Sequence, residues 1–379
     1  MIPARILAVA LVLGLCLPSV RAEELPCRRA DPDNPRPRIG LVLGGGGARG
    51  IAHVAVLKEL ERLQVPIDCI AGTSMGSLVG GMYASGMRAE ELEAMLLGLD
   101  WRQVLKDDIA RGERSYRRKQ DDLESLSPAK PGVGRQGLRL SSGLVSGQNI
   151  QLLLERQIGR SAGIADFDRL PIPFRAVATD INTGRAVVLG EGSLAQAMRA
   201  SMAIPGVFNP VLRDGRLLVD GGLVNQVPID VVRAMGADIV IAVDVGTPLA
   251  ELAPDSSALA IADQTMGLLT VGNTRAQLAT LGPRDVLIQP ALGREVSTGS
   301  FDKTAEALAI GERAATEAAP QLATLAAPGL PRPALPDAAL RVDFLVLDNR
   351  SGYDDAVFLR HLDGLRGKPL DRDDIERRI

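Results

Sequence analysis

The chain has 379 residues, of which 46% are hydrophobic and 23% are charged, and its formal net charge at pH 7 is −3. This is the composition of a globular protein that is long enough for one large domain or two smaller ones. The near-neutral charge argues against a nucleic-acid-binding surface, and aromatic residues at only 3% provide few rings on which bases could stack. We therefore expect no nucleic acid partner.

The first 22 residues have the three parts of a secretory signal peptide. Arg5 gives a basic start, residues 6–17 are a short apolar run, and Val20 and Ala22 stand at the −3 and −1 positions of a cleavage site. A membrane-spanning helix would need ~20 apolar residues, which is more than this run offers. We expect cleavage after Ala22 and export to the periplasm, the outer membrane or the extracellular space.

Two cysteines, Cys27 and Cys69, remain after such a cleavage. An oxidising compartment permits a disulfide between them. Cys69 lies in an apolar, strand-like run, however, and a buried thiol there acts as a small hydrophobic side chain. The sequence favours the buried thiol and leaves the pairing open.

Strands and helices alternate from residue 39 onward. An apolar run at 39–43 is typical of a buried parallel strand, and a glycine-rich turn leads from it into a helix over about 48–63. A second strand at 67–71 precedes a helix that begins at Ser74. Later strands are expected at 174–180, 216–220, 238–245 and 286–290. This alternation predicts an α/β fold with a mainly parallel sheet covered by helices on both faces.

A Pro- and Ala-rich linker over 328–339 follows the α/β region. The remaining segment, 340–379, has the pattern of an exposed strand followed by two helices, and a piece of that size buries little core. We expect the main domain over 37–327 and interpret 340–379 as the start of a second domain.

Gly72-Thr73-Ser74-Met75-Gly76 fits the pattern G-x-S-x-G between an expected strand and an expected helix. In that pattern the serine is a nucleophile on a strained turn, and the two glycines prevent a collision across the turn. The alternative is a small-residue helix start with Thr73 as N-cap. The strand–turn–helix context favours Ser74 as a nucleophile.

A serine hydroxyl needs a base, and the chain has only two histidines. His361 lies in the tail, and His53 lies on the first helix, where a packed core histidine is more common. A Ser-His-Asp triad is therefore poorly supplied. Asp220 ends an expected strand and precedes two glycines, and functional side chains of parallel sheets gather at the carboxyl ends of strands. An ordinary turn is the alternative reading of this Asp-Gly-Gly.

The glycine-rich loop over 44–50 follows a strand and begins a helix. Backbone N–H groups at a helix N-terminus attract negative charge, so in acyl transfer this loop would stabilise the oxyanion. The loop also matches a dinucleotide-binding fingerprint, which requires an acid at the end of the next strand. Asp68 stands at the start of that strand and Ser74 follows its end, so nucleotide binding is disfavoured.

These motifs together resemble the patatin-like phospholipases. The family has a strand, a G-G-G-x-R/K-G oxyanion loop, a G-x-S-x-G elbow and a later D-G-G/A, which here are 45–50, 72–76 and 220–222. Residues 198–210, MRASMAIPGVFNP, match as well, and the resemblance covers 37–327. It implies a three-layer α/β fold and a lipid acyl hydrolase of phospholipase A type that cleaves glycerophospholipid esters, with no metal or cofactor.

The resemblance also implies a serine–aspartate dyad without histidine. Carried over to this sequence, Ser74 is the nucleophile that forms an acyl-enzyme and Asp220 is the base. The oxyanion hole is implied at Gly45, Gly46 and Gly47, and the other motif glycines are Gly50, Gly72, Gly76, Gly221 and Gly222.

The signal-like start and the tail narrow the resemblance to the patatin-bearing outer-membrane proteins of Gram-negative bacteria. In those, a POTRA domain and a β-barrel follow the enzyme in the type V secretion manner, and 340–379 resembles the first half of a POTRA domain. The implied partners are a phospholipid or membrane surface, a homodimer and, in a longer chain, a C-terminal barrel. A catalytically idle, secreted lipid-binding module and, less favoured, a nucleotide-binding Rossmann-like protein remain as alternatives.

Overall fold

The computed structural model describes residues 25–27, 36–105, 132–134, 137–139, 143–256, 258–330, 333, 342, 345, 347 and 354–368. The expected signal peptide at 1–22 lies outside these residues, as do most of the expected strand and the second expected helix of the 340–379 segment. Within the described part of the chain, none of the helices has the length and apolar character needed to cross a bilayer.

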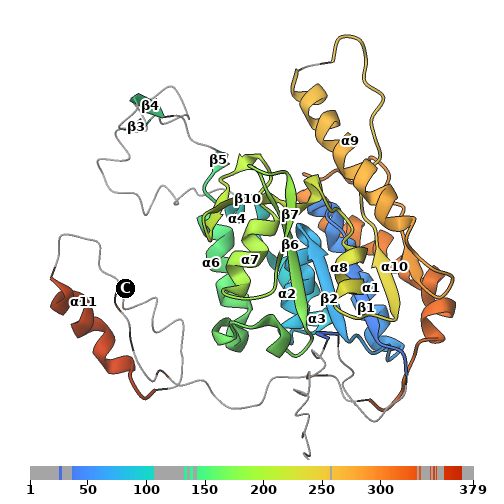
Figure 1. Ribbon diagram of the computed structural model, residues 1–379, viewed down its shortest axis with the longest axis horizontal. Coiled ribbons are helices and arrows are strands. Elements are labelled where there is room, and N and C mark those ends of the chain that lie inside the picture. The colour runs from blue at the N-terminus through green and yellow to red at the C-terminus, as the bar shows by residue number, and fades with distance from the viewer. Residues whose placement is uncertain are drawn as a thin grey trace, which may run out of the picture.

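An eight-stranded mixed sheet forms the centre of the fold (Figure 1). Its parallel part has the order β12 (Val286–Ile288), β11 (Ile239–Val243), β1 (Ile39–Leu43), β2 (Cys69–Thr73) and β6 (Phe174–Asp180). Three antiparallel strands complete the edge beyond β6: β7 (Arg185–Leu189), β9 (Val211–Arg213) and β10 (Arg216–Asp220). The expected α/β class with a mainly parallel sheet is confirmed.

The antiparallel edge was not expected from the sequence. The stretch 216–220 forms a strand as expected, but it runs antiparallel to β6. The two strands β7 and β9 are short and partly exposed, so neither has the apolar run that marks a buried strand. Two small two-stranded sheets lie outside the main sheet and pair β3 (Gly132–Gly134) with β4 (Gly137–Arg139) and β5 (Gly143–Val145) with β8 (Gly206–Phe208).

Helices cover both faces of the main sheet. The α-helices are α1 (Ala52–Arg62), α2 (Met75–Ala84), α3 (Ala89–Gly98), α4 (Trp101–Val104), α6 (Gln148–Gln157), α7 (Leu194–Ser201), α8 (Ile229–Ala234), α9 (Ala258–Leu278), α10 (Thr304–Ala323) and α11 (Asp355–Leu362). Short 3₁₀ turns are η1 (Gly47–Ile51), η2 (Gly159–Gly163), η3 (Phe167–Arg169), η4 (Gly221–Leu223), η5 (Phe301–Lys303) and η6 (Asp363–Leu365). The helix expected at 48–63 therefore starts as a 3₁₀ turn.

The central strands are buried on both faces, and successive residues pack into two separate cores. Along β1, Leu41 and Leu43 join the larger core, whereas Val42 joins the smaller one. The larger core is formed with α1, α2, α7 and α10, and the smaller core is covered by α8. This double burial explains why these strands are continuous apolar runs.

The smaller core contains a disulfide between Cys27 and Cys69. The sequence favoured a free buried thiol at Cys69. Cys69 is indeed fully buried, but the N–H of Cys27 donates to the carbonyl of Met235 at the end of α8, at 2.8 Å. This contact brings the two cysteines together, so the folded unit includes Cys27, ten residues before the expected start at residue 37.

The register of the sheet brings the ends of two strands face to face. Beside β6, Thr73 at the end of β2 pairs with Val177, and Asp220 at the end of β10 pairs with the next residue, Ala178. Because β2 is parallel and β10 antiparallel to β6, their carboxyl ends point toward each other. The residue after Thr73, Ser74, therefore lies next to Asp220.

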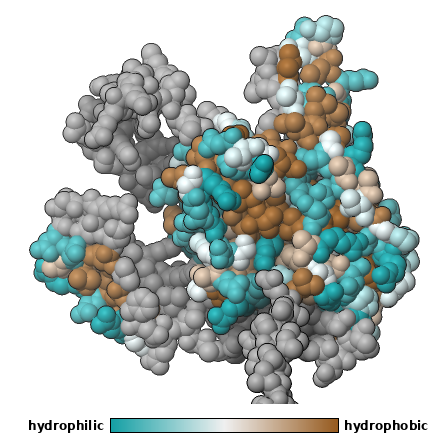
Figure 2. Space-filling view, viewed as in Figure 1, coloured by the Kyte–Doolittle hydropathy of each residue, from teal (hydrophilic) through white to brown (hydrophobic). Residues whose placement is uncertain are grey.

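Helix α9 projects from the body of the molecule (Figure 1). The same view in Figure 2 shows hydrophobic surface along this projecting helix. Its inner end lies against the turn that follows β10, and its outer part carries some of the most exposed apolar side chains of the described chain.

Candidate active site

The turn between β2 and α2 holds Ser74 in a backbone conformation that is rare for any residue except glycine. Its φ is 53° and its ψ is −123°. The two flanking glycines leave no room for a side chain: a Cβ at Gly72 would lie 2.4 Å from the carbonyl oxygen of Gly76, and one at Gly76 would lie 2.1 Å from that of Leu43. The strained elbow that the sequence predicted is present.

The hydroxyl of Ser74 donates a hydrogen bond to Oδ2 of Asp220 at 2.7 Å. Both residues are buried but reach a pocket, with 5% of Ser74 and 8% of Asp220 exposed. The backbone N–H of Ser74 donates to the hydroxyl of Ser201 at 2.9 Å, and that hydroxyl donates to the carbonyl of Val177 at 2.5 Å. Ser201 therefore fixes the elbow to β6.

Burial changes the acid–base behaviour of Asp220. The low-dielectric surroundings raise its pKa to about 6, while the hydrogen bonds from Ser74 and from the N–H of Gly222 favour the carboxylate and limit this rise. The Gly222 bond to Oδ1 is 2.8 Å long. A carboxylate with this pKa is a better match to proton transfer near neutral pH than an exposed aspartate.

The backbone N–H groups of the glycine loop differ in whether they already have a hydrogen-bond acceptor. The N–H of Gly45 donates to the carbonyl of Gln226 at 3.0 Å, so it is not available to an oxyanion. The N–H groups of Gly46 and Gly47 have no acceptor within the described part of the chain, and both residues line the pocket of Ser74. Of the three glycines named for an oxyanion hole, the geometry suits Gly46 and Gly47.

The remaining motif glycines are positions of close approach. A Cβ at Gly50 would lie 2.5 Å from Cγ of Met75, and one at Gly221 would lie 2.1 Å from the carbonyl oxygen of Val177. At Gly222 the nearest atom would be Oε1 of Gln226, at 2.2 Å. All three glycines thus let other parts of the site pack against the backbone.

Two polar side chains that sequence reasoning did not find join the separate parts of this site. Gln226 donates from Nε2 to the carbonyl of Gly45 at 2.8 Å. Asn273 on α9 donates from Nδ2 to the carbonyl of Gly222 at 2.9 Å and accepts the N–H of Gln226 at 2.9 Å. The turn after Asp220 is therefore tied both to the glycine loop and to α9. Asn273 is 51 residues from Gly222 in the chain, and no local motif marks it.

Arg49 of the loop motif is a structural clamp. Only 3% of it is exposed, and its guanidinium donates to the carbonyls of Val245 at 2.7 Å, Gly246 at 2.9 Å, Gly293 at 2.6 Å and Val296 at 2.7 Å. Burial lowers the pKa of this arginine. These bonds join η1, the turn that leads into α1, to the segments that follow β11 and β12.

His53 supports the glycine loop. The ring is fully buried, and its Nε2 donates to the carbonyl of Gly44 at 2.8 Å, so the neutral Nε2–H tautomer is the one that fits. Burial lowers the pKa of His53 to about 4, which keeps the ring neutral at physiological pH. The other histidine, His361, is exposed on α11.

Asp180, at the end of β6, is another carboxylate near this part of the sheet, and its hydrogen bonds differ from those of Asp220. Its Oδ1 accepts the N–H of Asn182 and its Oδ2 accepts the hydroxyl of Thr183, both at 3.0 Å. These bonds close the turn between β6 and β7. The carboxylate next to Ser74 is that of Asp220.

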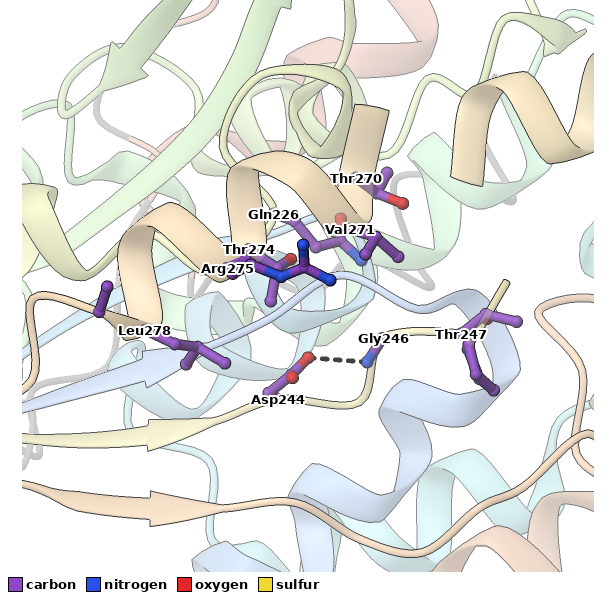
Figure 3. Close-up of a pocket in the computed structure, with 11 residues that line it drawn as sticks. Gln226, Asp244, Gly246, Thr247, Thr270, Val271, Thr274, Arg275 and Leu278 are labelled. Atoms are coloured by element: carbon purple, nitrogen blue, oxygen red, sulfur yellow. Dashed lines mark hydrogen bonds between the residues drawn. The ribbon is translucent and has the colours of Figure 1, made fainter. Parts of the chain in front are cut away.

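Two adjoining cavities lie under α9. The first has a volume of about 450 Å³ and contains Ser74, Asp220, Gly46 and Gly47 in its lining. The second, of about 560 Å³, lies between α9 and the end of β11, and Figure 3 shows that Arg275 of α9 and Asp244 line it. The two cavities share four lining residues, Gln226, Thr247, Pro248 and Thr270, so they are direct neighbours.

Comparisons with known proteins agree with this arrangement. A model of the patatin-like phospholipase family matches residues 41–233, about half of the chain, and this range includes the glycine loop, the elbow and the Asp220 turn. An uncharacterised NTE-family protein of Mycobacterium tuberculosis is 36% identical over 207 residues, which are 55% of this chain and 49% of that protein. The human patatin-like phospholipase domain-containing protein 6 is 36% identical over 211 residues, 55% of this chain and 13% of that protein.

The chain thus spans half or less of the length of these curated relatives. Two solved structures are similar at low sequence identity. VipD from Legionella pneumophila gives a TM-score of 0.40 at 15% identity, covering 75% of this chain and 66% of that one. ExoU in its complex with SpcU from Pseudomonas aeruginosa gives a TM-score of 0.37 at 18% identity, covering 76% and 52%.

Proposed function

The chain belongs to the patatin-like phospholipase family, and on this premise we propose that it hydrolyses carboxyl esters of glycerophospholipids through an acyl-enzyme on Ser74. The observation that carries the proposal is the 2.7 Å hydrogen bond from the Ser74 hydroxyl to Asp220 inside an accessible pocket. This hydrogen bond joins a serine on a strained turn, which would be the nucleophile, to a carboxylate of raised pKa, which would be the base.

In the first half of the reaction, Asp220 takes the hydroxyl proton as Ser74 Oγ attacks the ester carbonyl carbon. The N–H groups of Gly46 and Gly47 stabilise the negative charge that develops on the carbonyl oxygen. Removing one such donor typically raises a barrier by ~3 kcal/mol. The protonated Asp220 then gives its proton to the leaving lysophospholipid oxygen, and the acyl group stays on Ser74.

In the second half, a water molecule takes the place of the leaving alcohol. Asp220 accepts a proton from this water, whose oxygen attacks the acyl carbon, and the proton passes to Ser74 Oγ as the fatty acid leaves. One carboxylate thus serves as base and acid in both halves. A pKa of about 6 suits this double use, because both protonation states are accessible near neutral pH.

A fluorophosphonate probe tests the nucleophile directly. The wild-type protein should be labelled covalently, with the modified peptide containing Ser74, and hydrolysis of a short-chain ester should stop with labelling. Ser74→Ala should abolish both. Labelling that persists in Ser74→Ala would rule out Ser74 as the nucleophile. A wild-type protein that binds lipid but is neither labelled nor able to hydrolyse an ester would support a catalytically idle lipid-binding module instead. Product analysis on phospholipids with distinct acyl chains then identifies the ester position.

We further propose that the protein is exported, as the patatin-bearing outer-membrane proteins are. The disulfide between Cys27 and Cys69 supports this, because disulfides persist in oxidising compartments. Expressed in a Gram-negative host, the mature protein should begin at Glu23 in intact-mass measurements. A mature chain that retains Met1 and stays with free thiols would contradict export. We also propose that the hydrolase domain covers 37–327 together with Cys27, and that 340–379 is the start of a POTRA-like domain.

A further inference from the structure

Five large apolar side chains are exposed on α9 and on the segment before it, and we call them the α9 patch. They are Leu249 (38% exposed), Leu252 (39%), Ile261 (52%), Leu268 (55%) and Leu269 (52%). Single exposed apolar residues are common, but a group on one projecting element indicates an interaction surface. Figure 2 shows the hydrophobic colour along this helix.

The segment before α9 lies along the helix. The side chain of Gln264 binds both backbone groups of Ala250, accepting its N–H at 3.0 Å and donating to its carbonyl at 2.9 Å. One turn further, a Cβ at Gly267 would lie 3.3 Å from Cδ2 of Leu249. The segment is therefore held against the helix, and the two form one projecting unit.

This surface continues into the pocket of Ser74. The same helix contributes Gln264, Gly267 and Thr270 to the pocket lining. Leu249 both lines the pocket and is exposed. The α9 patch thus begins at the rim of the cavity that holds the nucleophile.

The described charges beside the patch show no excess of basic residues. Glu251 and Asp255 are exposed on the segment before α9, Arg275 is exposed on α9, and Arg294 and Glu295 are exposed on the segment after β12. Arg294 donates to the carbonyl of Leu249 at 3.2 Å and lines the pocket. Three acids and two bases give this surface no attraction for anionic headgroups, so its partner is held by apolar contact, with little dependence on salt.

We propose that the α9 patch docks the protein on a lipid surface with zwitterionic headgroups, so that an ester passes from that surface into the pocket of Ser74. The proposal rests on the proposed lipid hydrolysis, since the substrate would itself be a component of the docking surface. A projecting helix with apolar side chains fits insertion at a headgroup boundary.

The test replaces two patch leucines that do not line the pocket. The double variant Leu268→Gln/Leu269→Gln is compared with Leu97→Gln/Leu152→Gln, which removes two leucines of similar exposure (47% and 46%) from α3 and α6. Figure 1 places both control helices away from α9. Equal thermal midpoints of both variants and wild type show that the folds are intact.

Flotation with phosphatidylcholine vesicles, in a Ser74→Ala background, measures docking without hydrolysis. The protein with an unchanged patch should bind the vesicles. The patch variant should bind ~10-fold or more weakly, because its two glutamines cannot gain the free energy that leucines gain on entering the lipid. The control variant should bind like wild type, and raising salt should change little. Equal binding by all three proteins, or no binding by any, overturns the proposal. Binding that salt abolishes overturns it as well.

Hydrolysis separates this proposal from the proposed function. With Ser74 in place, the patch variant should keep wild-type rates on a monomeric short-chain ester and lose ~10-fold on vesicle phospholipid. If wild type hydrolyses no ester but the vesicle result holds, docking stands and the proposed function fails. If wild type is a dimer that the patch variant makes monomeric, with vesicle binding unchanged, the patch is a self-interface and the proposal is wrong.

Discussion

The turn that holds Ser74 and the turn that holds Asp220 meet at one point, but they are built differently. The Ser74 turn is fixed mainly by its own backbone, which has a positive φ and no room for a side chain at Gly72 or Gly76, with one added bond from the Ser74 N–H to Ser201. The Asp220 turn is held by side-chain bonds to other parts of the fold: Gln226 ties it to the glycine loop, and the distant Asn273 binds the carbonyl of Gly222 and the N–H of Gln226. The proposed nucleophile is thus positioned largely by its local sequence, whereas the position of the proposed base depends on contacts across the fold.

The largest expected effect comes from breaking the local turn. In Gly76→Ala the new Cβ would lie 2.1 Å from the carbonyl oxygen of Leu43, so the elbow or the end of β1 must move. We expect a loss of ~3 kcal/mol or more in the free energy of unfolding and no measurable ester hydrolysis. Gly98→Ala is the control, since nothing lies within 4 Å of its Cβ position. Denaturant unfolding that shows equal stability for both variants would refute the account of the elbow.

The buried carboxylate of the second turn should destabilise the protein at neutral pH. Its native pKa of about 6 is above its ordinary value of 3.8, so the native state favours the protonated form. Ionised Asp220 therefore costs up to ~3 kcal/mol above pH 6, and this cost disappears as pH falls toward 4. We expect Asp220→Asn to be more stable than wild type at pH 8 and equal to it near pH 4. A stability difference that is independent of pH would contradict the raised pKa.

The same ionisation should appear in the reaction rate. As pH falls from 8 to 5, protonation of Asp220 should lower kcat/KM on a soluble ester ~10-fold through a single ionisation near pH 6. His53→Gln should shift neither the rate nor this ionisation by much, because His53 binds Gly44 and stays neutral. If the acid limb disappears in a folded His53→Gln protein, the histidine is the base.

A smaller effect is expected from loosening the distributed turn. Asn273→Ala removes the bonds to Gly222 and Gln226 but leaves the Ser74 turn untouched. We expect kcat to fall ~5-fold with little change in KM, together with a loss of ~1 kcal/mol in stability. Thr265→Ala is the matched control on α9, because that exposed hydroxyl donates to the carbonyl of Ile261 within its own helix. An unchanged kcat in Asn273→Ala would show that α9 does not position Asp220.

This difference between the turns also explains what the sequence could predict. The strands at 39–43 and 174–180 and the elbow at 72–76 are consecutive patterns, and they were found as expected. The antiparallel β7 and β9, the Cys27–Cys69 bond and the bond of Gly45 to Gln226 depend on segments that meet only in the fold. The register in which β2 and β10 pair with β6 brings these two strands end to end, but the sequence of neither strand contains a pattern that predicts it.

The most direct test of the Ser74–Asp220 dyad is the kcat of Asp220→Asn on a soluble ester at pH 8. Asparagine keeps the shape and the reach to Ser74 and Gly222 but cannot accept the proton of the serine hydroxyl. We predict a protein that folds, binds the ester with near-normal KM and turns it over ~10²–10⁴-fold more slowly, the range lost with a general base. Near-normal turnover in Asp220→Asn would contradict the dyad and rule out this aspartate as the base.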